Sequence, residues 1–174
     1  MQRRTFLEWT IHGLGALLAA VLGIPAIAYL IDARNRPSRQ TGMRTVAKLS
    51  DLEIGVPKEI VIRETRQDAW NLHPDDVVGR VWLVRENADT VKAFSTTCPH
   101  LGCSIDRSEN GFLCPCHGGR FNLDGKRVVP TEGNNPAPRS MDELPLEKGP
   151  APDYEIRVEY KRFKTSLDQP VEDI

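Results

Sequence analysis

The sequence has no excess of either charge: among its 174 residues, 23 are basic and 24 acidic, with a formal net charge of -1 at pH 7. It also lacks the clustered basic stripe that binding to a nucleic-acid backbone requires. Internal repeats and low-complexity tracts are absent, and long helical patterns are few. The 13 prolines and 13 glycines instead indicate a loop-rich β domain. We therefore expect one globular domain with extensions, and no nucleic-acid partner.

Residues 10–31 contain no aspartate, glutamate, lysine or arginine. As a helix this run would extend about 33 Å, which is enough to cross a hydrocarbon core of about 30 Å. We therefore expect a transmembrane anchor over residues 10–31. A cleaved signal peptide is the alternative, because Ala26 and Ala28 form a small-x-small pattern, but the apolar run continues past them to Ile31.

Residues 1–9 carry the adjacent pair Arg3 and Arg4 and resemble the twin-arginine export signal. That pathway exports proteins that have already folded around a cofactor. Arginines flank both ends of the apolar run, so loop charge alone does not set the orientation. The export signal predicts a single-pass protein of the bacterial cytoplasmic membrane, with its head domain on the periplasmic side.

Residues 32–44 are polar and charged, and they predict a flexible linker between the anchor and a head domain at residues 45–174. Runs rich in β-branched and aromatic residues then predict strands at residues 59–63, 80–85, 91–94 and 154–160. The second and third of these runs are expected to form a hairpin.

A polar insertion, residues 66–78, matches no pattern that we can assign. His73 within it is expected on the surface. We expect Trp70, Trp82 and Phe94 to pack in the core rather than to contact a ligand.

All four cysteines lie in two short loops, CPHLGC at residues 98–103 and CPCHGG at residues 114–119, and each loop also contains one histidine. Two structural disulfides would use every cysteine but would leave the histidines without a role. A zinc site would use four cysteine or histidine ligands, commonly paired as CxxC and HxxxH. An iron-sulfur cluster is the third explanation, and neither rival accounts for the way each loop combines two cysteines with one histidine.

These loops resemble the two cluster-binding loops of Rieske iron-sulfur proteins, in which two histidines and two cysteines hold a 2Fe-2S centre. The resemblance implies that Cys98 and Cys114 bind the inner iron and that His100 and His117 bind the outer one. It further implies a disulfide between Cys103 and Cys116, which would need an oxidising compartment. The implied fold is an all-β Rieske head, an antiparallel β sandwich with a cluster-binding subdomain.

The proline-rich loop 134–145 contains NPAPRSMDELP and is similar to the segment that covers the cluster in the Rieske subunits of cytochrome bc complexes. By the same resemblance, Leu101 and Pro138 shield the cluster. High-potential relatives carry a serine and a tyrosine at the positions of Gly119 and Phe121, and their hydroxyls donate hydrogen bonds to sulfur. Because both donors are missing here, we expect a low midpoint potential suited to a quinol such as menaquinol.

The resemblance implies an electron-transfer subunit of a membrane quinol:cytochrome c oxidoreductase, which is not catalytic in isolation. Its expected partners are quinol, cytochrome b and a c-type cytochrome, and either His100 or His117 would take the quinol proton. The alternative is the Rieske small subunit of a periplasmic molybdenum oxidase such as arsenite oxidase. A soluble Rieske ferredoxin serving a dioxygenase and a zinc-binding module are weaker alternatives.

Overall fold

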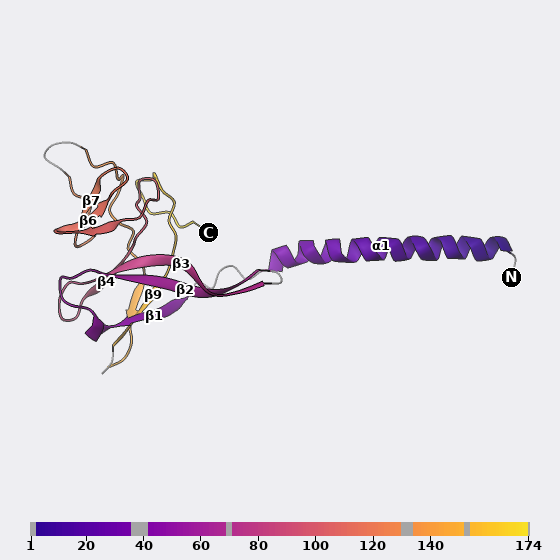
Figure 1. Ribbon diagram of the computed structural model, residues 1–174, viewed down its shortest axis with the longest axis horizontal. Helices are drawn as coiled ribbons and strands as arrows, with labels where there is room; N and C mark the ends of the chain where they lie inside the picture. The colour runs from indigo at the N-terminus through magenta and orange to yellow at the C-terminus, as the bar shows by residue number, and fades with distance from the viewer. Residues whose placement is uncertain (1–2, 36–41, 69–70, 130–133, 152–153, 174) are drawn as a thin grey trace. The chain divides into compact units, whose positions relative to one another are not determined.

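The computed structural model describes residues 3–35, 42–68, 71–129, 134–151 and 154–173 (Figure 1). The chain forms two compact units, residues 1–40 and residues 41–174. The first unit is one helix and the second is a β domain, and each is described by itself. Of the predicted linker, residues 32–44, residues 36–41 lie outside the described residues, while residues 32–35 belong to the helix and residues 43–44 already belong to the first β-strand.

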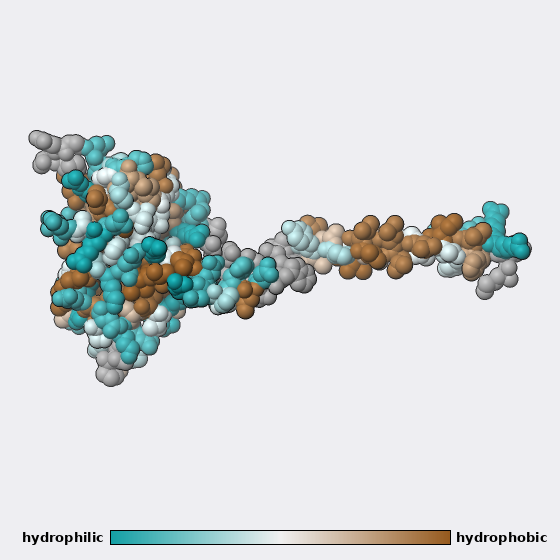
Figure 2. Space-filling view, viewed as in Figure 1, coloured by the Kyte–Doolittle hydropathy of each residue, from teal (hydrophilic) through white to brown (hydrophobic). Residues whose placement is uncertain are grey.

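Helix α1, Arg3–Asn35, contains the predicted anchor and extends beyond it at both ends. Residues 3–9 of the expected export signal and residues 32–35 of the expected linker are therefore helical. The span Arg3–Ile31 is long and apolar enough to cross a membrane, although a signal sequence would pass the same test. Its apolar side chains form the surface of the middle of the helix (Figure 2). Pro25 lies inside the helix, where a membrane environment tolerates proline.

Within its described residues, the β domain contains three antiparallel sheets of three strands each, which confirms the predicted all-β head. Sheet one has the order β1-β9-β8, sheet two β2-β3-β4 and sheet three β5-β6-β7. The strands are β1 Met43–Lys48, β2 Lys58–Asp68, β3 Asn71–Arg85, β4 Val91–Ser95, β5 Asp106–Ser108, β6 Gly111–Cys114, β7 Gly119–Asn122, β8 Leu146–Lys148 and β9 Glu155–Glu159. A short 3-10 helix, Leu49–Asp51, follows β1. The predicted hairpin is formed by β3 and β4, and the strand predicted at residues 154–160 is β9.

Sheet two separates two hydrophobic cores, because side chains on successive residues of a strand point to opposite faces. Val81 and Leu83 of β3 pack with Ile156 and Val158 of β9 in the first core. The intervening Trp82 packs into the second core, which also contains Val84, Phe94, Phe112, Phe121, Cys98 and Cys114. Trp82 and Phe94 are thus core residues as predicted, whereas Trp70 lies outside the described residues. The second core attaches the two cysteine-containing loops to the rest of the domain.

The insertion at residues 66–78 is the distal part of the hairpin between β2 and β3, which extends as a two-stranded ribbon (Figure 1). His73 pairs with Arg66 in this ribbon and is exposed, as predicted. Two register shifts interrupt the pairing, between Ile62 and Arg63 and between Glu64 and Arg66. The insertion therefore elongates two strands of sheet two.

Candidate metal centre

The two cysteine-containing loops have the same local construction. In the first loop, the Gly102 N–H donates to the Cys98 carbonyl at 2.9 Å, and in the second the Gly118 N–H donates to the Cys114 carbonyl at 3.0 Å. Both glycines have positive φ, +81° and +74°, in the left-handed region that residues with a Cβ rarely adopt. Each CxxxG segment therefore closes a tight turn that begins at a cysteine.

The loops are attached to different strands. The first follows β4, and its base is closed by a hydrogen bond from the Cys98 N–H to the Cys103 carbonyl at 2.8 Å. The second joins β6 to β7, where Cys114 pairs with Gly119 across the hairpin. The ends of both loops are thus fixed by the second hydrophobic core.

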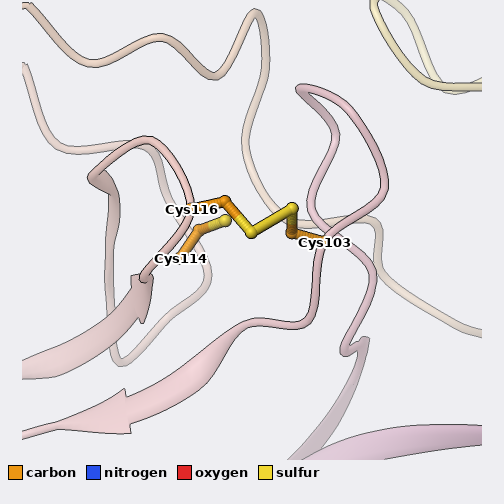
Figure 3. Close-up of side chains that lie close together, drawn as sticks. All are labelled: Cys103, Cys114 and Cys116. Carbon is orange, nitrogen blue, oxygen red and sulfur yellow. A yellow bond between two sulfur atoms is a disulfide. The ribbon is translucent and has the colours of Figure 1, made fainter.

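A disulfide between Cys103 and Cys116 joins the loops, with a Cα–Cα distance of 6.6 Å (Figure 3). The sulfur of Cys114 belongs to the same group, and the three sulfur atoms lie within 4.8 Å of one another. The disulfide has the pairing that the Rieske resemblance implies. It leaves Cys98 and Cys114 as the two free cysteines, and both are buried.

The two histidines, one from each loop, face each other. The rings of His100 and His117 are nearly perpendicular, with centroids 4.8 Å apart. Nδ1 of His100 is buried and has no hydrogen-bond partner within the part of the chain that the structure describes. A buried ring nitrogen without a partner is costly, so it points to a ligand at this position.

Burial raises the pKa of the Cys98 thiol to about 11. The backbone N–H groups of His100 and Leu101 oppose this effect, whereas the neighbouring Cys114 side chain adds to it. A thiol coordinates metal as the thiolate, so metal binding must remove the Cys98 proton. The two loops supply two buried free thiols and two imidazoles whose rings face each other, which is the donor set of a Rieske-type 2Fe-2S cluster.

The other predicted site residues lie around these donors. Gly119 is buried between the thiols: a Cβ at this position would lie 3.7 Å from the Cys98 sulfur and 3.5 Å from the Cys114 Cβ. Phe121 is in the second core, while Leu101 is exposed at the tip of the first loop and Pro138 is half-buried.

Asn135 attaches the proline-rich loop to the second cysteine loop, a role that the motif alone did not indicate. Its side-chain amide donates to the Arg120 carbonyl at 2.7 Å and to the Val128 carbonyl at 2.9 Å, and its side-chain oxygen accepts from the Ala137 N–H at 3.2 Å. Asn135 is buried and lies beside Gly119. The loop is therefore fixed to the end of β7 next to the thiols.

Arg139 and Asp142 form a buried ion pair in the same loop, with two parallel hydrogen bonds of 2.7 and 2.8 Å. The remaining donors of Arg139 reach the carbonyls of Lys164 and Leu167. Ser166, in that C-terminal segment, donates to the His100 carbonyl. No sequence pattern marks Ser166, because its partner is 66 residues away.

The comparisons with known proteins agree on one family. The family model for the Rieske [2Fe-2S] domain matches residues 43–145. The menaquinol:cytochrome c reductase iron-sulfur subunit of Geobacillus thermodenitrificans is 30% identical over 142 residues, which cover 79% of this chain and 82% of the relative. The cytochrome b6-f complex iron-sulfur subunit of Chlorobaculum thiosulfatiphilum is 27% identical over 160 residues, covering 91% and 71%. The crystal structure of the cyanobacterial plasma membrane Rieske protein PetC3 from Synechocystis PCC 6803 matches with a TM-score of 0.39 and 27% identity, over 51% of this chain and 85% of that one.

Proposed function

We propose that this chain, which belongs to the Rieske [2Fe-2S] domain family, is the electron-transfer subunit of a membrane menaquinol:cytochrome c oxidoreductase. Relatives named as iron-sulfur subunits of a menaquinol:cytochrome c reductase and of the cytochrome b6-f complex support a quinol:cytochrome electron-transfer role and give no support to the molybdenum-oxidase alternative. Helix α1 and these membrane-complex relatives support a single-pass membrane protein. Cytochrome b and a c-type cytochrome are the proposed partners.

The observation that carries the proposal is the donor set of the two loops, two buried free thiols and two histidine rings with centroids 4.8 Å apart. Cys98 and Cys114 would hold one iron as thiolates, and His100 and His117 would hold the other through ring nitrogens. The bound cluster supplies one-electron redox chemistry at the surface of the head. Cys103 and Cys116 hold the loops at a fixed separation around it.

The two histidines have a second proposed role as proton carriers. An imidazole that holds metal through one nitrogen keeps its other nitrogen available to bind or release a proton. His117 is exposed and His100 half-buried, so either ring can offer that nitrogen to a quinol hydroxyl. Leu101, exposed beside His100, supplies an apolar contact surface that excludes water from this hydrogen bond.

A low midpoint potential is the second part of the proposal. Hydrogen bonds to sulfur stabilise the reduced and more negative form of an iron-sulfur centre. Gly119 lies beside the Cys98 sulfur but has no hydroxyl to donate, and Phe121 has none either. A low potential fits menaquinol, the donor that is named for the relatives.

We further propose that the head is periplasmic and that residues 1–9 act as a twin-arginine signal. A disulfide persists in an oxidising compartment, and a folded, cluster-bound head would require a pathway for folded proteins. Replacing Arg3 and Arg4 with lysine tests this point, because export should stop while the apolar run stays unchanged.

A redox titration of the complete protein in its membrane, followed by low-temperature electron paramagnetic resonance, tests the function. The expected result is a 2Fe-2S signal of low average g that titrates at low potential and is reduced by menaquinol. Solubilised protein should co-purify with haem-containing cytochrome b. Zinc without inorganic sulfide, or co-purification with a molybdopterin subunit in place of cytochrome b, would contradict the proposal.

A further inference from the structure

The segment after β9 forms a short hairpin of its own. The Lys164 N–H donates to the Val171 carbonyl, and the Asp173 N–H donates to the Arg162 carbonyl, each at 2.8 Å. The match to the Rieske domain ends at residue 145, so this hairpin, residues 161–173, lies beyond the matched domain. We call it the C-terminal strap.

The turn of the strap contacts the first cluster loop. The Ser166 N–H donates to the Pro99 carbonyl at 2.8 Å, and the Ser166 hydroxyl donates to the His100 carbonyl at 2.7 Å. The methyl group of Thr165 lies 3.7 Å from the position that a Cβ on Gly102 would occupy. One residue of the strap thus binds two successive carbonyls next to a proposed ligand.

A residue of the proline-rich loop, Arg139, binds the strap. Arg139 donates to the Lys164 carbonyl at 2.9 Å and to the Leu167 carbonyl, so its two acceptors lie on either side of Ser166 in the sequence. The guanidinium is buried and oriented by Asp142. The turn of the strap is therefore bound to a rigidly held guanidinium, because a bidentate arginine-carboxylate pair leaves the guanidinium little conformational freedom.

We propose that the C-terminal strap fixes the geometry of the first cluster loop and that Ser166 is a positioning residue for His100. These two Ser166 hydrogen bonds support the loop tip from outside the loop, in addition to its turn and base hydrogen bonds, the disulfide and the ring contact between His100 and His117. A ligand whose backbone is held keeps its ring orientation, and supporting contacts of this kind influence metal affinity and redox behaviour. The inference rests on the proposed assignment of His100 as a ligand, but not on the identity of the quinol.

The backbone conformation of Ser166 allows two variants to separate the effect of losing the hydroxyl from the effect of backbone strain in the turn. Its φ is +61°, a left-handed conformation that glycine adopts more easily than alanine or serine. Replacement with glycine removes the hydroxyl and also relieves the backbone strain of the left-handed conformation. Replacement with alanine removes the hydroxyl but keeps that strain. The two variants should therefore change overall stability differently while removing the same contact to His100.

The experiment compares Ser166→Ala and Ser166→Gly in the complete, cluster-bound protein. Hydrogen-deuterium exchange of the peptide containing residues 98–103 should become faster in both variants, by about fivefold for the loss of one hydrogen bond. The g values and the midpoint potential of the 2Fe-2S signal should move in the same direction in both. Thr165→Val is the matched control, since it removes a neighbouring hydroxyl but keeps a side chain of similar shape, and it should leave exchange, signal and potential unchanged.

A purely structural role predicts a different pattern, in which thermal stability changes but loop exchange, g values and potential stay at the wild-type values. That result in both variants would overturn the proposal. A wild-type protein without a Rieske signal would refute the proposed function instead, and loop exchange in the same variants would still decide whether the strap holds residues 98–103.

Discussion

Gly119 is the residue whose small size has the clearest chemical consequence. A Cβ there would stand at ordinary van der Waals distances, 3.7 Å from the Cys98 sulfur and 3.7 Å from the Asn135 side-chain oxygen. The Cβ of a serine therefore fits without displacing backbone, and its hydroxyl would be placed next to the Cys98 sulfur. The low potential that we propose thus depends on a missing donor, because the space for one is present.

Gly119→Ser should raise the midpoint potential by on the order of 60 mV, which corresponds to a tenfold change in a one-electron equilibrium. The physical reason is a new hydroxyl donor that stabilises the more negative, reduced centre. The measurement is a redox titration followed by electron paramagnetic resonance. Gly119→Ala is the matched control, since it adds the same Cβ without a hydroxyl, and an equal rise in both variants would show that packing rather than hydrogen bonding sets the potential.

Residue-scale features were predictable where the chemistry lies in a short motif. The two loops are identifiable because their cysteines and histidines are adjacent in sequence, whereas the turns at Gly102 and Gly118 are a finding of the structure. Ser166 could not be found in this way. Its contact with His100 depends on how the strap folds back over 66 residues, and an isolated serine gives no local signal.

At the scale of elements, the predictable parts of the fold were those set by burial. The β-branched and aromatic residues of the run 80–85 predict a strand, and the structure places the side chains of Val81, Trp82 and Leu83 alternately in the two cores. Strand β3 nevertheless begins at Asn71, because backbone pairing with β2 rather than burial supports its exposed polar half. A hydropathy pattern gives no signal for a strand that is stabilised by backbone pairing alone.

The disulfide connects two elements that otherwise belong to separate hairpins. Cys103 and Cys116 are 13 residues apart, and closing a loop of this size is worth about 3 kcal/mol of unfolding free energy. The double variant Cys103→Ser, Cys116→Ser should therefore lose about 3 kcal/mol in denaturant unfolding of the cluster-bound protein. The wild-type protein under reducing conditions is the comparison, and it should approach the variant's stability.

A loss well below 1 kcal/mol in that experiment would mean that the second core, rather than the disulfide, fixes the loop separation. The core already holds both loops at Cys98 and Cys114, which are fully buried. The disulfide acts farther out, at the exposed Cys116 and half-buried Cys103. Its expected effect is therefore on the loop tips, where the histidines lie.

At the scale of the whole molecule, the chain consists of an apolar helix and a β domain that form separate compact units. The helix contains the membrane-spanning sequence, whereas the proposed ligands are all in the β domain. In the proposed function, the domain must accept an electron at a quinol site and deliver it to a cytochrome haem. A tether that lets the domain move between the two sites meets this requirement.

A rigid tether should therefore slow the enzyme without changing the cluster. Replacing residues 36–41 with a proline-rich segment of equal length should reduce quinol:cytochrome c turnover in the assembled complex by about tenfold or more, because stiff polyproline segments restrict domain travel. The electron paramagnetic resonance signal and the midpoint potential should stay unchanged, since no ligand or supporting residue is altered. A glycine- and serine-rich replacement of the same length is the control and should keep wild-type turnover. Normal turnover with the rigid tether would show that the domain does not need to move, and both electron-transfer partners would then have to lie within reach of a single position of the loop tips.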